Sequence, residues 1–111
     1  MNAMKDTGIY TYREVEMEII RWSEARKIIP NSTPLAQTKK AMEEINELYD
    51  ALVDGDPAKA RDGVGDTVVC LINVCALMNV DLVECLIEAY REIKDRKGHM
   101  NEEGIFVKEA A

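Results

Sequence analysis

The stretch from Thr67 to Met78 constrains the fold of this 111-residue chain more than any other feature. Nearly every side chain in it is apolar, and between Val68 and Met78 only Asn73 interrupts the run. The run is too short to cross a bilayer. A helix that is apolar all round is normally buried inside a protein. We therefore expect a central helix that other helices cover.

Turn signals divide the rest of the chain into further helices. Thr33 and Asp56 have the character of N-cap residues, and each is followed by a proline at the first helical position. Pro30 and Gly55 end the segments that precede these caps. The signals predict four helices, at about 11–29, 34–53, 57–78 and 82–97, and an extended tail over 99–111.

The apolar spacing in these segments predicts which helix faces are buried. Short links between amphipathic helices are typical of an antiparallel bundle. We expect an all-α, antiparallel four-helix bundle that forms a single domain over 1–111. The third helix is too apolar for a lone small bundle, so part of its surface is expected to meet a second copy in a homo-oligomer. The predicted buried stripes are Tyr12, Val15, Ile19, Trp22 and Ile29; Ala41, Ile45, Leu48 and Leu52; and Leu82, Leu86, Tyr90 and Ile93.

Charge and cysteine content exclude several classes of protein. The net charge of −7 does not attract phosphate backbones, so we expect neither a nucleic-acid partner nor a membrane partner. Met1 to Tyr10 lacks the apolar segment of a signal peptide. Cys70, Cys75 and Cys85 lie in apolar stretches at spacings that match no zinc site. We expect all three to be reduced core residues, as in a cytoplasmic protein.

Acidic residues on the two middle helices form the most informative pattern. On the second helix, one strip carries Gln37, Lys40, Glu44 and Glu47, and Glu43 lies further toward solvent. On the third helix, one face carries Asp62, Asp66, Val69 and Asn73. If the two helices pair antiparallel across their short link, the two strips meet.

A cluster of this kind needs a compensating charge. At ~4 Å and an effective dielectric constant near 20, each pair of like charges costs about 4 kcal/mol. A fold retains such a cluster only if the carboxylates are protonated or a cation neutralises them. Oxygen ligands without His or Cys favour Mg²⁺ or Mn²⁺. The alternative is that these residues form ordinary solvated helix faces.

Two local departures from helix rules favour a site. Gly63 and Gly65 lie inside the third helix, where each costs roughly 1 kcal/mol relative to Ala. Such departures tend to occur at functional sites, and the alternative is close helix packing. Asn73 needs hydrogen-bond partners if it is buried. It is a candidate for contacting a carboxylate or a substrate, and the alternative is a structural hydrogen bond to a neighbouring helix.

Basic and aromatic residues complete the candidate site. Lys40 precedes the carboxylates by one turn, and Lys94, Arg96 and Lys97 close the fourth helix. These cations are candidates for holding phosphate oxygens, although cations are favoured at a helix C-terminus in any case. Trp22 is a candidate for stacking on a base, with a core aromatic as the alternative.

The second helix carries the pattern Gln37-x-x-Lys40-x-x-Glu43-Glu44-x-x-Glu47-Leu48, which is followed by Asp66 and an apolar helix. This pattern resembles that of the MazG-like all-α nucleoside triphosphate pyrophosphohydrolases. The ending from Tyr90 to Gly98 resembles their short single-domain forms, and the resemblance covers roughly Trp22 to Lys108. The family pattern is Glu-Glu-x-x-Glu, a spacer, then Glu-x-x-Asp. Its last Glu falls on Gly63 here, and Asp62 on the same helix face is the natural substitute.

The resemblance implies roles for these residues. Glu44, Glu47 and Asp66 would be metal ligands, with Asp62 as the fourth, and Glu43 would bind a further ion or orient water. As a mechanistic hypothesis, a carboxylate not fully used by metal, such as Glu43, takes the proton of the attacking water. Lys40 and the basic end of the fourth helix would contact phosphates. The family usually forms a dimer or a dimer of dimers, with sites built from more than one subunit.

The expected function is Mg²⁺-dependent hydrolysis of a nucleoside triphosphate to its monophosphate and pyrophosphate, in nucleotide-pool housekeeping. Because Gly63 departs from the family pattern, the alternative is a non-catalytic helical interaction module that retains the fold.

Overall fold

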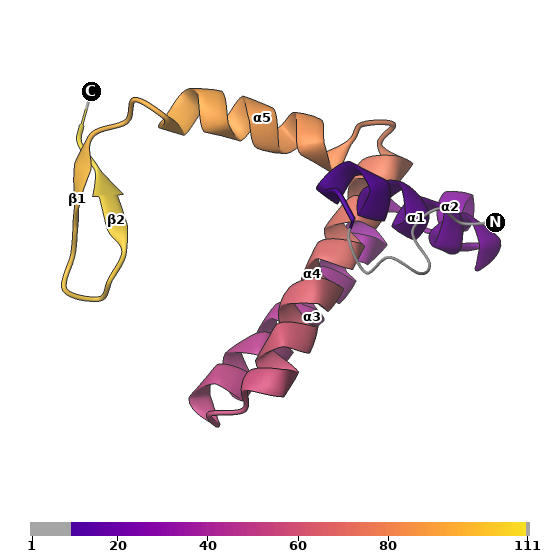
Figure 1. Ribbon diagram of the computed structural model, residues 1–111, viewed down its shortest axis with the longest axis horizontal. Helices are drawn as coiled ribbons and strands as arrows, with labels where there is room; N and C mark the ends of the chain where they lie inside the picture. The colour runs from indigo at the N-terminus through magenta and orange to yellow at the C-terminus, as the bar shows by residue number, and fades with distance from the viewer. Residues whose placement is uncertain (1–9, 111) are drawn as a thin grey trace.

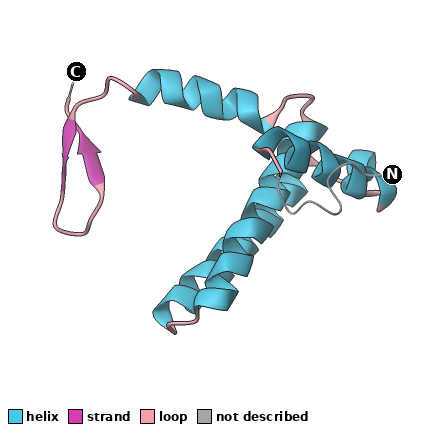
Figure 2. Cartoon of the chain, viewed as in Figure 1, coloured by secondary structure: helices cyan, strands magenta, loops and turns pink. Residues whose placement is uncertain are grey.

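The computed structural model describes residues 10–110, which form helices throughout most of their length and end in a β-hairpin (Figures 1 and 2). Met1 to Ile9 lie outside the described residues, and so does most of the segment examined for a signal peptide. The elements, in chain order, are α1 (Tyr12–Ala25), α2 (Ile28–Asn31), α3 (Pro34–Val53), α4 (Pro57–Leu77), α5 (Leu82–Ile93), β1 (Gly98–Met100) and β2 (Phe106–Lys108).

Helices α3 and α4 run side by side as an antiparallel hairpin, as predicted (Figure 1). The predicted caps are in place: the Thr33 hydroxyl accepts from the Ala36 amide at 3.0 Å, and Asp56 accepts from the Lys59 amide at 3.1 Å. Gly55, with a φ of +69°, makes the turn between the helices. These signals are local in sequence, which explains why the bounds of both helices could be predicted.

Gly63 sets how closely the two helices approach. A Cβ atom at this position would lie 2.9 Å from Leu48 Cβ and 3.1 Å from Leu48 Cα. Close helix packing, the alternative considered for this glycine, is therefore what the structure contains. Gly65 is different, because a Cβ atom there would meet nothing within 4 Å.

This close approach turns α3 away from its predicted orientation. Small residues, Ala41 and Ala51, are buried against α4, because only short side chains fit between closely packed helices. Ile45 and Leu52 are exposed instead, so the predicted buried stripe of this helix was wrong at both positions.

The first helix ends earlier than predicted. Lys27 adopts a left-handed conformation with a φ of 68°, and this stops α1 at Ala25 and starts the short α2. Tyr12 and Trp22 of the predicted stripe are exposed. Glu16 and Ser23 are fully buried in their place, because both polar side chains find hydrogen-bond partners on other segments.

Asn73 lies at the centre of a buried hydrogen-bond chain. The Ser23 hydroxyl donates to Asn73 Oδ1 at 2.6 Å, and Asn73 Nδ2 donates to Gln37 Oε1 at 3.2 Å. Gln37 Nε2 in turn donates to the Ser32 hydroxyl at 3.0 Å. The chain of bonds ties α1, α4 and α3 together. Asn73, which is only 2% exposed, thus makes the structural hydrogen bonds considered as the alternative to substrate contact.

Helix α5 leaves the rest of the molecule (Figure 1). Its axis is bent by 100° from that of α4, and its predicted buried residues Leu86, Tyr90 and Ile93 are exposed. Within residues 10–110, one chain therefore closes no four-helix bundle. At the start of α5, the Leu82 amide donates to Glu16 Oε2 of α1 at 2.9 Å.

The tail forms an antiparallel β-hairpin in which His99 pairs with Val107. Asn101 closes its turn by accepting from the amides of Glu103 and Ile105 at 3.0 and 2.9 Å.

Among residues 10–110, no single helix is long and apolar enough to cross a bilayer. The pair α4 and α5 meets the length and composition criteria only when the two helices are taken together across their bend.

Candidate metal and nucleotide site

An acidic cavity of about 290 Å³ lies along the α3–α4 hairpin. All four residues predicted as metal ligands line it, two from each helix. The antiparallel pairing thus brings together the two strips of carboxylates that were identified on separate helices. The lining residues are Glu44, Glu47, Asp50, Ala51, Asp54, Lys59, Asp62, Gly63 and Asp66.

The donor chemistry of this cavity fits a hard divalent cation. Six carboxylates line it, with no His or Cys among them, and oxygen ligands of this kind are those that Mg²⁺ and Mn²⁺ prefer. The carboxylates do not converge on one ion-binding point. Within residues 10–110, no three acidic, His or Cys side chains are grouped closely enough to hold an ion. The tight convergence expected from the sequence is therefore absent, and ligation requires the side chains to turn toward the cavity.

The contact between Leu48 and Gly63 divides the hairpin into two halves. Glu44 and Asp66 lie on the half nearer α1. Burial raises the pKa of the neighbouring Cys70 thiol, and the negative charges of Glu44 and Asp66 raise it further. Asp54 and Lys59 flank the turn at the other end. The cavity therefore extends along the hairpin, from Asp66 toward the turn.

Lys40 lies beside the two adjacent glutamates of the motif, of which Glu44 lines the cavity. Its ammonium is 3.6 Å from a carboxylate oxygen of Glu43 and 3.6 Å from one of Glu44. The negative charges of Glu43 and Glu44 raise the pKa of Lys40. Glu44 is largely covered, whereas Glu43 is exposed and does not line the cavity. The predicted catalytic position of Glu43 is thus outside the cavity within a single chain.

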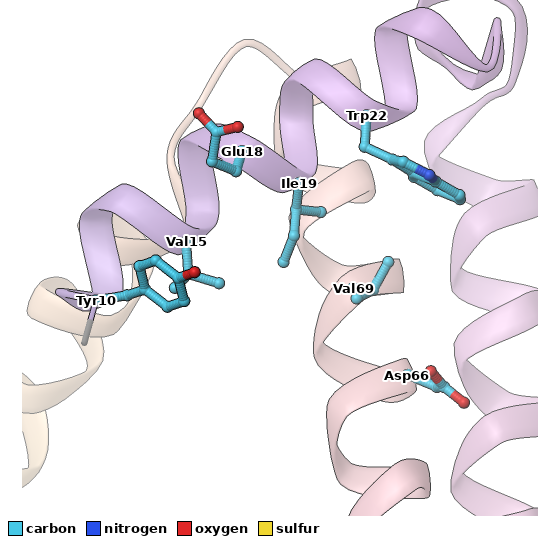
Figure 3. A pocket seen from close by; sticks show the side chains of 7 residues that line it. All are labelled: Tyr10, Val15, Glu18, Ile19, Trp22, Asp66 and Val69. Carbon is cyan, nitrogen blue, oxygen red and sulfur yellow. The ribbon is translucent and has the colours of Figure 1, made fainter. Parts of the chain in front are cut away.

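A second cavity of about 500 Å³ lies between α1 and α4 and is mainly apolar (Figure 3). Ile19 and Trp22 point from α1 toward the space where Val69 and Asp66 lie. Trp22 is 47% exposed, so it is not the core aromatic considered as the alternative. The full lining is Tyr10, Val15, Glu18, Ile19, Trp22, Asp66 and Val69. Asp66 lines both cavities, which therefore meet at this carboxylate.

Several predicted residues lie away from both cavities. Gln37 and Asn73 are held in the buried hydrogen-bond chain. Lys94 pairs with Asp95, and Arg96 and Lys97 line a separate cavity of about 490 Å³ beside the β-hairpin. One chain therefore does not bring the basic end of α5 to the acidic cavity.

Three residues that line the acidic cavity are not among the site residues predicted from the sequence. Asp50 and Asp54 continue the strip of Glu47 at positions i+3 and i+7, and Lys59 precedes Asp62 by three residues and Asp66 by seven. Their spacing was visible in the sequence. What was missing was the close approach at Gly63, which makes the two strips walls of one cavity.

Comparisons with known proteins identify the family and the fold of the chain. The family model for phosphoribosyl-ATP pyrophosphohydrolase matches residues 5–97. An uncharacterised 18.2 kDa protein from the rep-hol intergenic region of Haemophilus phage HP1 is 32% identical over 65 residues. That match covers 59% of this chain and 40% of the phage protein, so the chain spans about two fifths of the length of this relative.

Among solved structures, the cyanophage S-2L MazG-like pyrophosphohydrolase, bound to dGDP and three catalytic Mn²⁺ ions per active site, has the same fold with a TM-score of 0.68. The two chains are 24% identical, and the match covers 92% of this chain and 100% of the cyanophage chain. The resemblance predicted from the α3 motif is confirmed. Since the family model covers most of the sequence, the chain belongs to the phosphoribosyl-ATP pyrophosphohydrolase family, with the all-α fold of the MazG-like enzymes.

Proposed function

We propose that this protein hydrolyses a nucleoside triphosphate to its monophosphate and pyrophosphate with the help of a divalent cation. The observation that carries the proposal is the meeting of an acidic cavity and an apolar cavity at Asp66. Metal-bound phosphates suit the first and a nucleobase suits the second. A cytoplasmic location and a role in nucleotide-pool housekeeping belong to the same proposal.

In this proposal Glu44, Glu47, Asp62 and Asp66 hold Mg²⁺ or Mn²⁺, which supplies a Lewis acid for the phosphate oxygens when bound. The three Mn²⁺ ions of the cyanophage protein support a divalent cation. Gly63 packs against Leu48, so the carboxylate at this level comes from Asp62. The acidic lining also repels free nucleotide, and binding is expected to depend on the cation.

The reaction itself is an in-line substitution at the α-phosphorus. A water oxygen forms a bond to this phosphorus, the bond from the phosphorus to the bridging oxygen breaks, and pyrophosphate leaves with the bonding electron pair. The water proton passes to a carboxylate that lines the cavity. Glu43 does not line the cavity, and we assign it the role of holding Lys40 beside Glu44.

Trp22 supplies the flat surface for the base. Its ring is exposed to the apolar cavity, and the Arg26 guanidinium lies 5.3 Å from the ring centroid. Stacking on a single aromatic face tolerates every base. The preferred base is therefore expected to depend on the other residues of the cavity wall.

Pyrophosphate release from a panel of ribo- and deoxyribonucleoside triphosphates tests the proposal, with Mg²⁺ or Mn²⁺ present. We expect Glu47→Gln to lower the rate at least about 100-fold, the upper end of what weakening a metal site costs. Glu102→Gln, in the exposed turn of the β-hairpin, is the matched control and should change nothing.

Addition of EDTA should abolish nucleotide binding as well as turnover. Background-level release by the wild-type protein across the whole panel would overturn the proposal. In that case, absence of metal-dependent nucleotide binding would favour the non-catalytic interaction module.

We also propose that the protein works as a homo-oligomer. Five apolar side chains along α3 are exposed by 49% to 80%, and the spacings between successive ones are seven, three, four and three residues. They are Leu35, Met42, Ile45, Tyr49 and Leu52. This spacing is that of a helix–helix seam. Leu86, Tyr90 and Ile93 of α5 are exposed as well. Monomeric proteins rarely expose so much contiguous apolar surface.

A further inference from the structure

Lys59 is the only basic residue among the described residues that line the acidic cavity. It faces a lining of six carboxylates, yet within residues 10–110 its ammonium lies within ion-pair distance of none of them. The roles assigned above leave this charge unused. An uncommitted cation in a cavity suited to metal-bound phosphates points to an anionic group of the substrate.

The position of Lys59 along α4 is well defined. Its amide donates to the Asp56 carboxylate at 3.1 Å, which fixes the first turn of the helix. Lys59, Asp62 and Asp66 follow at i, i+3 and i+7, so their side chains share one strip. At 1.5 Å per residue, Lys59 lies about 10 Å from Asp66 along the helix axis. Lys59 is therefore at the turn end of the cavity.

The apolar cavity adjoins the opposite end. It meets the acidic cavity at Asp66 and carries Trp22 on its α1 wall (Figure 3). A nucleotide has an aromatic base at one end and its highest negative charge at the other. With the base beside Trp22 and the α-phosphate near Asp66, the β- and γ-phosphates extend toward Lys59. The reverse orientation would put the base among carboxylates and the phosphates against apolar side chains.

The other cations that the sequence predicts as phosphate contacts do not line the acidic cavity within the described residues. Arg96 and Lys97 line a different cavity, beside the β-hairpin. Lys40 already lies beside Glu43 and Glu44. A lysine ammonium is an effective point charge for phosphate oxygens.

We propose that Lys59 is a positioning residue that binds the terminal phosphates of the nucleotide and, after cleavage, the pyrophosphate product. The inference rests on the proposed function and adds to it a direction for the bound substrate: base toward α1, phosphates toward the α3–α4 turn.

Product inhibition separates this role from a general structural one. The variants are Lys59→Ala and Lys59→Arg, with Lys39→Ala, on α3 and outside both cavities, as the matched control. We expect Lys59→Ala to weaken inhibition by pyrophosphate about tenfold, the effect of losing one hydrogen bond to a charged group. Inhibition by the nucleoside monophosphate should stay within about twofold, and Lys59→Arg should recover most of the loss. Equal weakening of both inhibitors, or no change in either, would contradict the proposal.

A binding measurement keeps the inference separate from the activity. Calorimetric titration of pyrophosphate in the presence of Mn²⁺ should give about tenfold weaker binding to Lys59→Ala than to the wild-type protein. If the protein cleaves no nucleotide but still shows this tenfold difference in pyrophosphate binding, the proposed reaction is wrong and the role of Lys59 is supported. Wild-type protein that binds no pyrophosphate, or binds it no more tightly than the variant, would overturn the role of Lys59.

Discussion

Position 63 illustrates how a single missing side chain shapes the site. Gly63 allows α3 and α4 to approach closely at Leu48, and the carboxylates above and below this contact then line one cavity. A Cβ atom here would be closer to Leu48 than real Cβ atoms approach their neighbours. The backbones of both helices would have to separate, which changes the width of the cavity.

Alanine substitutions at the two glycines of α4, Gly63 and Gly65, test whether Gly63 sets the spacing between α3 and α4. Gly63→Ala gains helix propensity but overpacks the contact with Leu48, and we expect a net loss of about 1–3 kcal/mol in the free energy of unfolding. Gly65→Ala meets nothing within 4 Å and should gain up to about 1 kcal/mol. Urea unfolding followed by circular dichroism measures both. Loss of stability in both variants, or in neither, would show that Gly63 does not set the helix spacing.

For single residues, the sequence predicts which side chains line the cavity better than it predicts which side chains are buried. Glu44 and Glu47 of the α3 motif line the same cavity as Asp62 and Asp66 of α4, whereas the motif residues Gln37, Lys40 and Glu43 do not line it. Lys59 could not be assigned, because its relevance depends on where the facing helix lies. Ile45 and Leu52 were expected to be buried on periodicity alone, which does not reveal that small side chains take the contact face.

Among the elements, α5 depends most on a distant residue. Its N-cap residue Asp81 makes no capping hydrogen bond of its own and instead pairs with Arg13 at 3.1 Å. The capping acceptor for the Leu82 amide is Glu16, fully buried on α1. Arg13 also lies 3.3 Å from Glu16 and so joins the two carboxylates. The first turn of α5 is therefore held by α1.

Removal of this cap should loosen α5 selectively. Glu16→Ala leaves the Leu82 amide without its acceptor, and we expect a loss of about 1–3 kcal/mol in the free energy of unfolding. Amide hydrogen exchange in the first turn of α5 should accelerate, while exchange at the centres of α3 and α4 should keep its order of protection. Glu24→Ala, exposed on the same helix, is the control. Unchanged exchange in α5 would mean that Glu16 does not anchor it.

Local signals account for which element bounds could be predicted. Thr33, Asp56 and the prolines that follow them defined the starts of α3 and α4 correctly. The break at Lys27 has no such signal, since a left-handed lysine is set by its surroundings rather than by its type. The contact between α5 and α1 was equally hidden, because the Leu82 amide and the Glu16 carboxylate that form it lie 66 positions apart.

For the whole molecule, the exposed seam on α3 is the feature that most needs a partner. Ile45, Tyr49 and Leu52 are exposed along α3, outside its close contact with α4 at Leu48 and Gly63. A second copy that covers this seam would bury apolar area worth roughly 25 cal/mol per Å². It would also supply a second α5, whose basic end does not line the acidic cavity of its own chain within the described residues.

Charges introduced on the seam should separate the copies. We expect wild-type protein to elute as a dimer or larger species in size-exclusion chromatography with light scattering at micromolar concentration. The double variant Ile45→Lys/Leu52→Lys should be a monomer, because two buried, unpaired charges per chain oppose association. Glu102→Lys, in the β-hairpin turn, makes a single change of the same sign outside the seam. A monomeric wild-type protein would refute the assembly.

Asp66 stands where two compartments share a wall. Under the proposed function, loading of the ion and choice of the base would be coupled through this one carboxylate. A substitution there would then alter both properties at once, so a change of nucleobase preference that spares the ionic requirement is expected at other residues of the apolar wall, such as Val15, Ile19 or Val69. Changes of base preference are therefore expected mainly on α1, which supplies most of the apolar lining.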